Sequence, residues 1–231
     1  ATVNTLMLNQ KNTKNNKDFD MIEAKLESIE DMEYRCLLYF GKLSQREKDE
    51  FEIISKMKNI KFISSDVVYT LIDEYKKFTE NNLEFKQEQL SLSGEAIFPC
   101  KLKILDDKIF MTGGTVDIMF GVKVLAGELK KGTPLFATNK KKFIGNVVSI
   151  KEYDKKGNAI DTNSAKIHKQ VCIRLKKDDY ILYGRHFDNK DLLVPHMTRE
   201  SIDILKKYFR NKLSMDDWKL TREIKDKLLI K

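Results

Sequence analysis

The stretch that decides the fold runs Val122-Lys-Val-Leu-Ala-Gly127-Glu-Leu-Lys-Lys-Gly132-Thr-Pro-Leu135. Apolar and β-branched residues dominate its beginning and its end, as is typical of strands, and glycines lie between them. The glycine spacing is similar to that of a phosphate-binding loop. The segment ends in Thr-Pro, however, where such a loop needs Lys-Ser or Lys-Thr. The segment from Gly127 to Gly132 therefore predicts a β-hairpin.

Strand patterns continue on both sides of this hairpin, within residues 94–198. Segments that are β-branched or that alternate between apolar and polar residues occur at 97–105, 115–125, 134–137, 143–153 and 169–175. Turn signals fall between them, at Asp106-Asp107, Gly113-Gly114, Lys131-Gly132 and Lys156-Gly157-Asn158. Short strands with regular turns predict an antiparallel β-barrel, either closed or sandwich-like.

Before this barrel, residues 1–65 alternate short apolar runs with helical patterns. Strands are predicted at 5–8, 35–40 and 60–63, and helices at 18–29 and 44–57. Asp18 and Ser44 are placed to cap the two helices, and Glu47 completes a capping box with Ser44. This alternation predicts a small α/β layer with parallel strands.

A longer helical pattern follows over residues 66–93. Ser64, Ser65 and Asp66 are placed to cap its start, and neither glycine nor proline interrupts it before Gly94. A single helix over 66–92 would be ~40 Å long. Its apolar stripe thins after Phe78, which is typical of a helix that bridges two domains through solvent.

Residues 199–231 return to helical periodicity. One helix is predicted over 201–212 and another over 214–229, the second with a capping box of Ser214 and Asp217. The predicted fold class is therefore multidomain α+β. It comprises a partial three-layer α/β domain (1–65), a long connecting helix (66–93), an antiparallel β-barrel (94–198) and two C-terminal helices packed on the barrel (199–231).

Charge is distributed unevenly along the 231 residues, whose formal net charge is +8. Residues 1–93 hold 14 basic and 17 acidic residues, residues 94–198 hold 19 and 12, and residues 199–231 hold 10 and 6. The basic surplus belongs to the barrel and its helices, which predicts an anionic partner, with RNA the first candidate. A composition that is simply rich in lysine is the alternative interpretation.

The composition also excludes several classes of protein. No stretch approaches the ~20 apolar residues of a membrane-spanning helix, and the first residues do not resemble a cleaved leader. Cys36, Cys100 and Cys172 lie far apart and are odd in number, which favours free thiols in a reducing compartment. We therefore expect a cytoplasmic protein without a membrane partner.

Sequence signals for catalysis are weak. His168, His186 and His196 are isolated from one another, and no spacing typical of a metal site surrounds them. No Gly-x-Ser-x-Gly nucleophile turn is present, and Asp216-Asp217 is better placed to favour a helix start than to act as a carboxylate pair. We expect no catalytic residue, metal or cofactor in this chain. The opposing hypothesis is an enzyme that uses His186 with a nearby carboxylate.

Several segments together carry a family resemblance. The quoted stretch is similar to the barrel repeat of translational GTPases. Further matching segments are Ile63-Ser-Ser-Asp-Val-Val-Tyr69, Ala96-Ile-Phe-Pro-Cys100, Gly184-Arg-His-Phe187, Thr198-Arg-Glu-Ser-Ile-Asp-Ile-Leu-Lys206, Phe209-Arg210 and Asp217-Trp218. Over nearly the whole chain they resemble the C-terminal part of eukaryotic translation initiation factor five B, the relative of bacterial initiation factor two. The resemblance implies a chain that begins inside domain three and continues through the connecting helix into barrel domain four.

The resemblance also implies partners. Full-length members of the family are ribosome-dependent GTPases that promote subunit joining, with GTP and magnesium in a GTPase domain that these residues do not include. Domain four holds the acceptor end of initiator methionyl-tRNA, and its C-terminal helices receive the acidic, hydrophobic tail of initiation factor one A. We expect a monomer that binds these partners and ribosomal subunits and does not itself hydrolyse GTP. The alternative is another translation-factor barrel module with a different RNA or protein ligand.

The two predicted C-terminal helices combine cations with large aromatic residues, which suits an acidic tail. The candidates for the tail of initiation factor one A are Lys207, Tyr208, Arg210, Trp218, Lys219, Arg222 and Lys225. The opposing interpretation is that Phe209 and Trp218 pack the helices onto the barrel. Tyr208, one position from Phe209, is then the better exposed candidate.

Candidates for contact with tRNA lie in the barrel. Arg185 and His186 stand at the end of a barrel strand, although they could equally support the junction of the barrel with the helices. Lys140, Lys141 and Lys142 form a hairpin-like basic tip that could contact RNA phosphates, or a charge run that is merely solvated. Phosphate contacts would make RNA binding fall steeply with salt.

Overall fold

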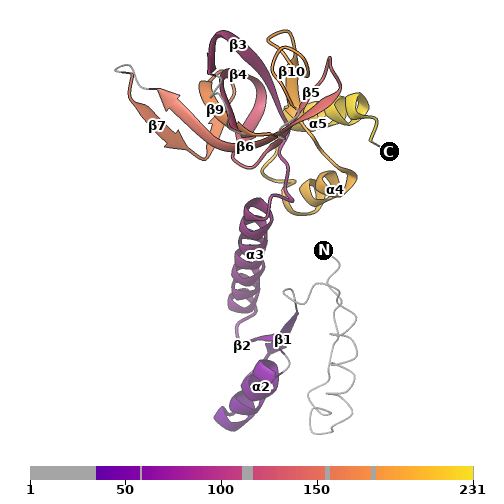
Figure 1. Cartoon of the computed structure of the whole chain (residues 1–231). Coiled ribbons are helices and arrows are strands. Elements are labelled where there is room, and N and C mark those ends of the chain that lie inside the picture. The colour runs from indigo at the N-terminus through magenta and orange to yellow at the C-terminus, as the bar shows by residue number, and fades with distance from the viewer. Residues whose placement is uncertain (1–34, 58, 111–116, 154–156, 178–180, 231) are drawn as a thin grey trace. The chain divides into compact units, whose positions relative to one another are not determined.

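The computed structural model describes residues 35–57, 59–110, 117–153, 157–177 and 181–230. Contacts divide the chain into two compact units, Ala1–Phe85 and Lys86–Lys231 (Figure 1). The strand predicted at 5–8, the helix predicted at 18–29 and the turn predicted at Gly113-Gly114 lie outside the described residues. The four-part division into 1–65, 66–93, 94–198 and 199–231 stays a prediction.

The described part of the first unit contains two parallel strands, β1 (Cys36–Phe40) and β2 (Lys61–Ser65), joined by helix α2 (Gln45–Met57). The Phe51 ring on α2 stacks on Phe62 of β2, with 5.2 Å between ring centroids, so the helix packs against the strand pair. The predicted capping box is present, because the Ser44 backbone N–H donates to Glu47 Oε2 at 2.9 Å and the Glu47 N–H donates to Ser44 Oγ at 3.4 Å. Over these residues the predicted parallel α/β arrangement is confirmed.

Helix α3 (Val68–Leu92) is continuous over 25 residues, which confirms the predicted long helix. It begins slightly later than predicted, since β2 extends to Ser65 and the Ser65 Oγ accepts a hydrogen bond from the Val67 N–H at 3.1 Å. After the helix, Gly94 has a φ of +79°, a conformation that glycine adopts readily. The chain turns there, and the Ala96 N–H donates to the Leu90 carbonyl at 3.0 Å.

The second unit contains a closed barrel of six antiparallel strands. Around the barrel, each pairing with the next and the last with the first, the strands are β3 (Cys100–Phe110), β10 (Leu192–Pro195), β5 (Pro134–Ala137), β6 (Lys142–Tyr153), β9 (Gln170–Lys176) and β4 (Asp117–Lys130). Two further strands extend the sheet, with β7 (Ala159–Thr162) paired to β6 and β8 (Ser164–Lys166) paired to β4. The predicted antiparallel barrel is confirmed in its closed form.

Two predicted turns within this barrel are wrong. The segment from Gly127 to Gly132 is not a hairpin, because β4 continues through Gly127 to Lys130 and β5 pairs with β6 and β10 instead. Gly127 has a φ of +69°, and a Cβ there would lie 2.1 Å from the Pro99 carbonyl oxygen, so the glycine permits a close strand crossing. The Asp106-Asp107 turn is likewise absent, because β3 runs through it with an irregular register against β4.

Two helices end the chain, α4 (Arg199–Tyr208) and α5 (Met215–Leu228), and Figure 1 shows them beside the barrel. The first starts before its predicted position, because Thr198 is its N-cap; the Thr198 side chain accepts from the Ser201 N–H. It also ends earlier, at Tyr208. The predicted capping box of Ser214 and Asp217 is confirmed, with the Ser214 N–H donating to Asp217 Oδ2 at 2.9 Å.

Two apolar clusters form the core of this unit. The first fills the barrel, with Phe120, Phe187, Leu102 and Ile173 among its fully buried members. The second joins the end of α3, the barrel wall and the C-terminal helices, and we name it the helix cluster: Leu90, Ala96, Phe98, Val194, Met197, Ile202, Leu205, Phe209, Leu220 and Ile224. A buried side chain of this size contributes about 1.5–3 kcal/mol, so the helix cluster holds α4 and α5 in place against the barrel.

Candidate binding surfaces on the C-terminal helices and the barrel

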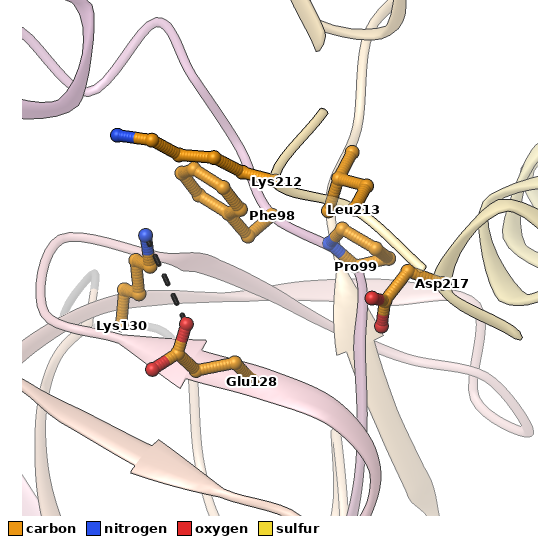
Figure 2. A pocket seen from close by; sticks show the side chains of 7 residues that line it. All are labelled: Phe98, Pro99, Glu128, Lys130, Lys212, Leu213 and Asp217. Carbon is orange, nitrogen blue, oxygen red and sulfur yellow. Dashed lines mark ion pairs between the residues drawn. The ribbon is translucent and has the colours of Figure 1, made fainter. Parts of the chain in front are cut away.

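A pocket of about 320 Å³ opens where the connection between α4 and α5 meets strand β4. Apolar groups form part of its lining, and charged side chains of both signs form the rest: Phe98, Pro99, Glu128, Lys130, Lys212, Leu213 and Asp217. Figure 2 shows Lys212 extended along one side of the Phe98 ring and Lys130 rising from β4 toward the other. The pocket therefore offers an apolar floor between two ammonium groups.

Lys130 is the most perturbed of these groups. Its Nζ lies 3.3 Å from the centroid of the Phe98 ring and 3.9 Å from Glu128 Oε2. Burial lowers the pKa of Lys130, Glu128 opposes that effect, and the neighbouring Lys212 cation lowers the pKa further. A second anion in the pocket would relieve the repulsion between Lys130 and Lys212, so the pocket is suited to a carboxylate that carries an apolar neighbour.

Three of the predicted tail-binding residues lie along one side of α5. Trp218, Arg222 and Lys225 recur at helical spacing, and Trp218 is half-buried against the helix cluster while Arg222 is exposed. Lys219 lies one position further round the helix and forms an exposed ion pair with Asp216 at 2.9 Å. Such a pair contributes little to stability. The structure thus brings Trp218, Arg222 and Lys225 together as one stripe, which we name the α5 stripe.

The predicted residues on α4 are more dispersed. Phe209 is 2% exposed and meets Phe98 edge to face at 5.1 Å, so its core role is confirmed. Tyr208 is only half-buried and packs on the same cluster, with Lys207 Nζ 5.1 Å from its ring centroid. Arg210 is exposed just beyond the helix. Tyr208 is thus more exposed than its neighbour Phe209, as expected, and both Tyr208 and Trp218 are half-buried.

The barrel candidates Arg185 and His186 lie in a tight loop before β10. His186 Nδ1 accepts a hydrogen bond from the Leu182 N–H at 3.0 Å, and the His186 N–H donates to the Leu182 carbonyl at 2.9 Å. These two bonds give His186 a structural role in the loop. Arg185 beside it is exposed, and Phe187 is fully buried in the barrel core. Arg185 is the charged side chain of this loop that a partner can reach.

The basic turn at Lys140, Lys141 and Lys142 is a true hairpin between β5 and β6, as predicted. A buried carboxylate that the sequence analysis missed holds it in place: Asp191 Oδ1 accepts from the Asn139 N–H at 3.1 Å and the Lys140 N–H at 3.3 Å. The other oxygen, Oδ2, accepts from the Asp188 N–H at 2.9 Å. Lys140 Nζ also lies 3.6 Å from Asp188 Oδ2. The fold therefore joins the lysine turn to the segment that follows Arg185 and His186.

Groups that could support catalysis are scarce in the described part of the chain. Within those residues no group of His, Cys, Asp and Glu side chains converges as a metal site would require. Burial raises the pKa of the Cys36 thiol to about 12, although Lys61 lowers it slightly, and burial raises that of Cys100 further still. Thiolate chemistry is therefore disfavoured at both cysteines. Among the described helices, none is long and apolar enough to cross a membrane.

Comparison with known proteins places these surfaces in context. Residues 98–194 match the family model described as elongation factor Tu domain 4. Human eukaryotic translation initiation factor 5B is 32% identical over 210 residues, which cover 89% of this chain and 16% of that protein. The probable translation initiation factor IF-2 of Staphylothermus marinus is 26% identical over 205 residues, covering 89% of this chain and 31% of that protein. The chain thus spans less than a third of the length of either relative.

A solved structure has the same fold. The crystal structure of GDP-bound aIF5B from Aeropyrum pernix aligns with a TM-score of 0.50 and 23% sequence identity, covering 83% of this chain and 30% of that chain. The alignment extends beyond the residues that the domain 4 model matches, so the shared fold includes elements outside residues 98–194.

Proposed function

The barrel of this chain belongs to the elongation factor Tu domain 4 family, and the chain as a whole matches the C-terminal region of translation initiation factor 5B; from that premise we propose that it is the partner-binding end of such a factor. In this proposal α4 and α5 receive the acidic, hydrophobic tail of initiation factor one A, and the barrel contacts the acceptor end of initiator methionyl-tRNA. The longer factor would be a GTPase acting with ribosomal subunits in the cytoplasm.

The observation that carries the proposal is the pocket beside the α5 stripe. Its apolar floor of Phe98, Pro99 and Leu213 suits an aliphatic or aromatic side chain, and Lys130 and Lys212 suit the carboxylates on either side of it. Asp217, which lines the pocket, precedes Trp218 in the chain. In this proposal a peptide that leaves the pocket continues along Trp218, Arg222 and Lys225.

Support for the tRNA contact comes from a different part of the barrel. Arg185 is exposed in a loop whose backbone is held by His186, and the nearby lysine turn is held by Asp191. Rigid loops that present cations position a nucleic acid through its phosphates. An enzyme that uses His186 as a base is disfavoured, since Nδ1 already accepts the Leu182 N–H. GTP and magnesium would belong to the GTPase domain of the longer factor.

Calorimetric titration of the chain with a synthetic tail peptide of initiation factor one A tests the first contact. Reversing the charge of Arg222 and Lys225 together should weaken binding about tenfold, which is about 1.4 kcal/mol. The matched control reverses Lys48 and Lys56, two exposed cations on α2, and should leave the affinity unchanged. Equal affinity for all three proteins would exclude the α5 stripe as the site.

The tRNA contact needs a separate measurement. Filter binding of labelled initiator methionyl-tRNA should show an affinity that falls steeply as salt rises, with a shallower slope for Arg185→Ala because one phosphate contact is lost. The peptide titration serves as the control, since Arg185→Ala should leave it unchanged. If Arg185→Ala bound tRNA as well as the parent chain at every salt concentration, this assignment would be wrong.

A further inference from the structure

Three aromatic side chains that neither line the pocket nor belong to the α5 stripe meet on the barrel, and one of them, Phe136, also packs against the helix cluster. The rings of Phe136 and His196 are stacked, with 5.8 Å between centroids and 23° between planes. The ring of Phe143 lies 5.6 Å from that of His196 at 59°. We name Phe136, Phe143 and His196 the aromatic platform. Aromatic side chains of a globular domain usually bury their faces, so a stacked set with an exposed member invites a partner.

Strand pairing builds this platform rigidly. Phe136 of β5 stands directly opposite Phe143 of β6 in the register, so both side chains lie on the same face of the sheet. His196 follows the last residue of β10, and its N–H donates to the Pro134 carbonyl at 2.8 Å. Phe136 and Phe143 are half-buried, whereas His196 is exposed. The imidazole is therefore the accessible flat surface, with the Phe136 ring stacked on it and the Phe143 ring tilted against it.

Positive charge lies next to the platform. The hairpin that joins Phe136 to Phe143 carries Lys140, Lys141 and Lys142, all of them exposed. No acidic residue occurs between Gly132 and Lys151 in the sequence, and Asp188, from another segment, offsets the charge of Lys140 at 3.6 Å. Since a strand rises ~3.4 Å per residue, the turn begins about 7 Å from the ring pair. The distance between the rings and the lysines is therefore comparable to the distance between a base and a neighbouring phosphate.

We propose that the aromatic platform and the adjacent lysine turn bind an unpaired RNA segment. One base would stack on the His196 ring, and the phosphates beside it would contact the lysines of the turn. The exposed face of the His196 ring, stacked on Phe136, favours a nucleobase over an acidic peptide, whose carboxylates have no face to stack. The inference rests on the proposed function in taking RNA as the partner, and it adds a surface that the Arg185 contact does not include.

Fluorescence anisotropy of the full chain with a labelled six-nucleotide RNA tests the stacking. The matched probe is an abasic oligonucleotide of the same length, which keeps the phosphates and removes the bases. We expect the RNA to bind about tenfold more tightly than the abasic strand, since a stacked base contributes on this scale. His196→Ala should abolish that difference by weakening the RNA alone. The double variant Lys141→Gln/Lys142→Gln should weaken both probes.

Tyr153→Ala is the control variant, because Tyr153 is an exposed aromatic residue at the opposite end of strand β6. It should leave both affinities unchanged. Circular dichroism of each variant confirms that the barrel is folded, and Phe143→Leu gives a second, milder test of the platform. Equal affinity for RNA and abasic strand, or a His196→Ala variant that binds RNA normally, would overturn the proposal. Preference for a polyglutamate peptide over RNA would overturn it as well.

The same variants separate this inference from the proposed function. Binding of the six-nucleotide RNA that depends on His196, together with initiator tRNA binding that ignores Arg185, would retain the platform and reject the acceptor-end contact. The reverse result would retain the acceptor-end contact and reject the platform.

Discussion

The side-chain amide of Gln87, near the end of α3, donates a hydrogen bond from Nε2 to the backbone carbonyl of Tyr208, the last residue of α4. The Gln87 side chain is 4% exposed, and its Oε1 has no partner among the residues that the structure describes. The last carbonyls of a helix have no partner within the helix itself. Gln87 therefore completes α4 from outside and couples the long helix to the surface proposed for the tail peptide.

Replacing Gln87 by alanine should destabilise the second unit. The Tyr208 carbonyl loses its buried donor, which costs about 1–3 kcal/mol, and loss of the unpartnered Oε1 offsets part of that cost. Urea denaturation followed by the fluorescence of Trp218, the single tryptophan, measures the change. Gln89→Ala is the matched control, since Gln89 is exposed on the same helix and should change stability by less than about 0.5 kcal/mol. Equal midpoints for the two variants would contradict the coupling.

Much of the fold could be predicted because its signals are local. Capping by Ser44 and Ser214, the uninterrupted pattern of α3 and the β-branched strands each depend on residues that are close in sequence. The strand β10 was missed because Leu192–Pro195 is too short to show alternation, and its partners β3 and β5 are distant in sequence. Gly127 was misread as a turn, since a glycine that permits a close crossing has the same local signature as one that forms a turn.

The candidate site was predicted less completely for the same reason. The cationic and aromatic content of α4 and α5 is visible in the sequence, and it led to Trp218 and Arg222. Lys130 could not be assigned from local pattern, although it stands in the stretch that decides the fold. Its role depends on the Phe98 ring, which a different segment contributes and whose centroid lies 3.3 Å from Lys130 Nζ. Asp191 was missed likewise, because Asn139 and Lys140, its partners in the lysine turn, precede it by 52 and 51 residues.

Asp191→Ala should loosen the lysine turn. Three backbone N–H groups, those of Asn139, Lys140 and Asp188, lose a carboxylate acceptor that is 1% exposed, so we expect a loss of about 3 kcal/mol or more. Denaturant unfolding gives the stability, and limited proteolysis should reveal new cleavage after Lys140 or Lys141. Asp161→Ala, at an exposed position on β7, is the control. Unchanged proteolysis in Asp191→Ala would show that the carboxylate does not hold the turn.

Gly127→Ala should be among the most damaging single substitutions in the barrel. The new Cβ would lie 2.1 Å from the Pro99 carbonyl oxygen, and both groups are backbone-anchored, so strands β3 and β4 must separate. Gly132→Ala is the matched comparison: its φ of +86° is equally unfavourable, but a Cβ there meets nothing within 4 Å. We expect a loss of about 1–2 kcal/mol for Gly132→Ala and a clearly larger loss for Gly127→Ala. The melting temperatures of the two variants, measured by thermal unfolding, test this difference. Equal melting temperatures would refute the close crossing.

The ion pair between Lys101 of β3 and Glu223 of α5 should make stability depend on acid pH. Hydrogen bonds from Lys101, at 2.8 Å, and from Lys227 lower the pKa of Glu223. A lowered carboxyl pKa contributes stability above the unfolded value of about 4.3, and this contribution is lost as pH falls through the folded pKa. Because both side chains are partly exposed, solvent screening limits the contribution to under about 1 kcal/mol.

Glu223→Gln isolates this contribution. At neutral pH the variant should be slightly less stable than the parent chain, and the difference should vanish as the pH falls through the lowered folded pKa of Glu223, where the parent carboxylate also becomes neutral. Urea midpoints at a series of pH values measure it, with Glu88→Gln at an exposed position of α3 as the control. A stability difference that persisted undiminished at low pH would assign the effect to packing instead of charge.

Lys130→Met should separate binding from stability in the pocket. The native ammonium group is half-buried and lies near the Lys212 cation, and these two effects lower its pKa. A group whose folded pKa is lowered works against folding while it is charged, so its removal should relieve that cost, while loss of the contact with Phe98 opposes the gain. We expect a net change in unfolding free energy within about 1 kcal/mol.

The affinity of Lys130→Met for an acidic tail peptide should nevertheless fall about tenfold, because one of two converging cations is gone. Lys212→Met, which removes the exposed partner cation and its repulsion of Lys130, should weaken peptide binding similarly while changing stability by less than about 0.5 kcal/mol. Peptide titration and urea denaturation of both variants give the two readouts, and undiminished peptide affinity in both would place the acidic tail elsewhere on the helices.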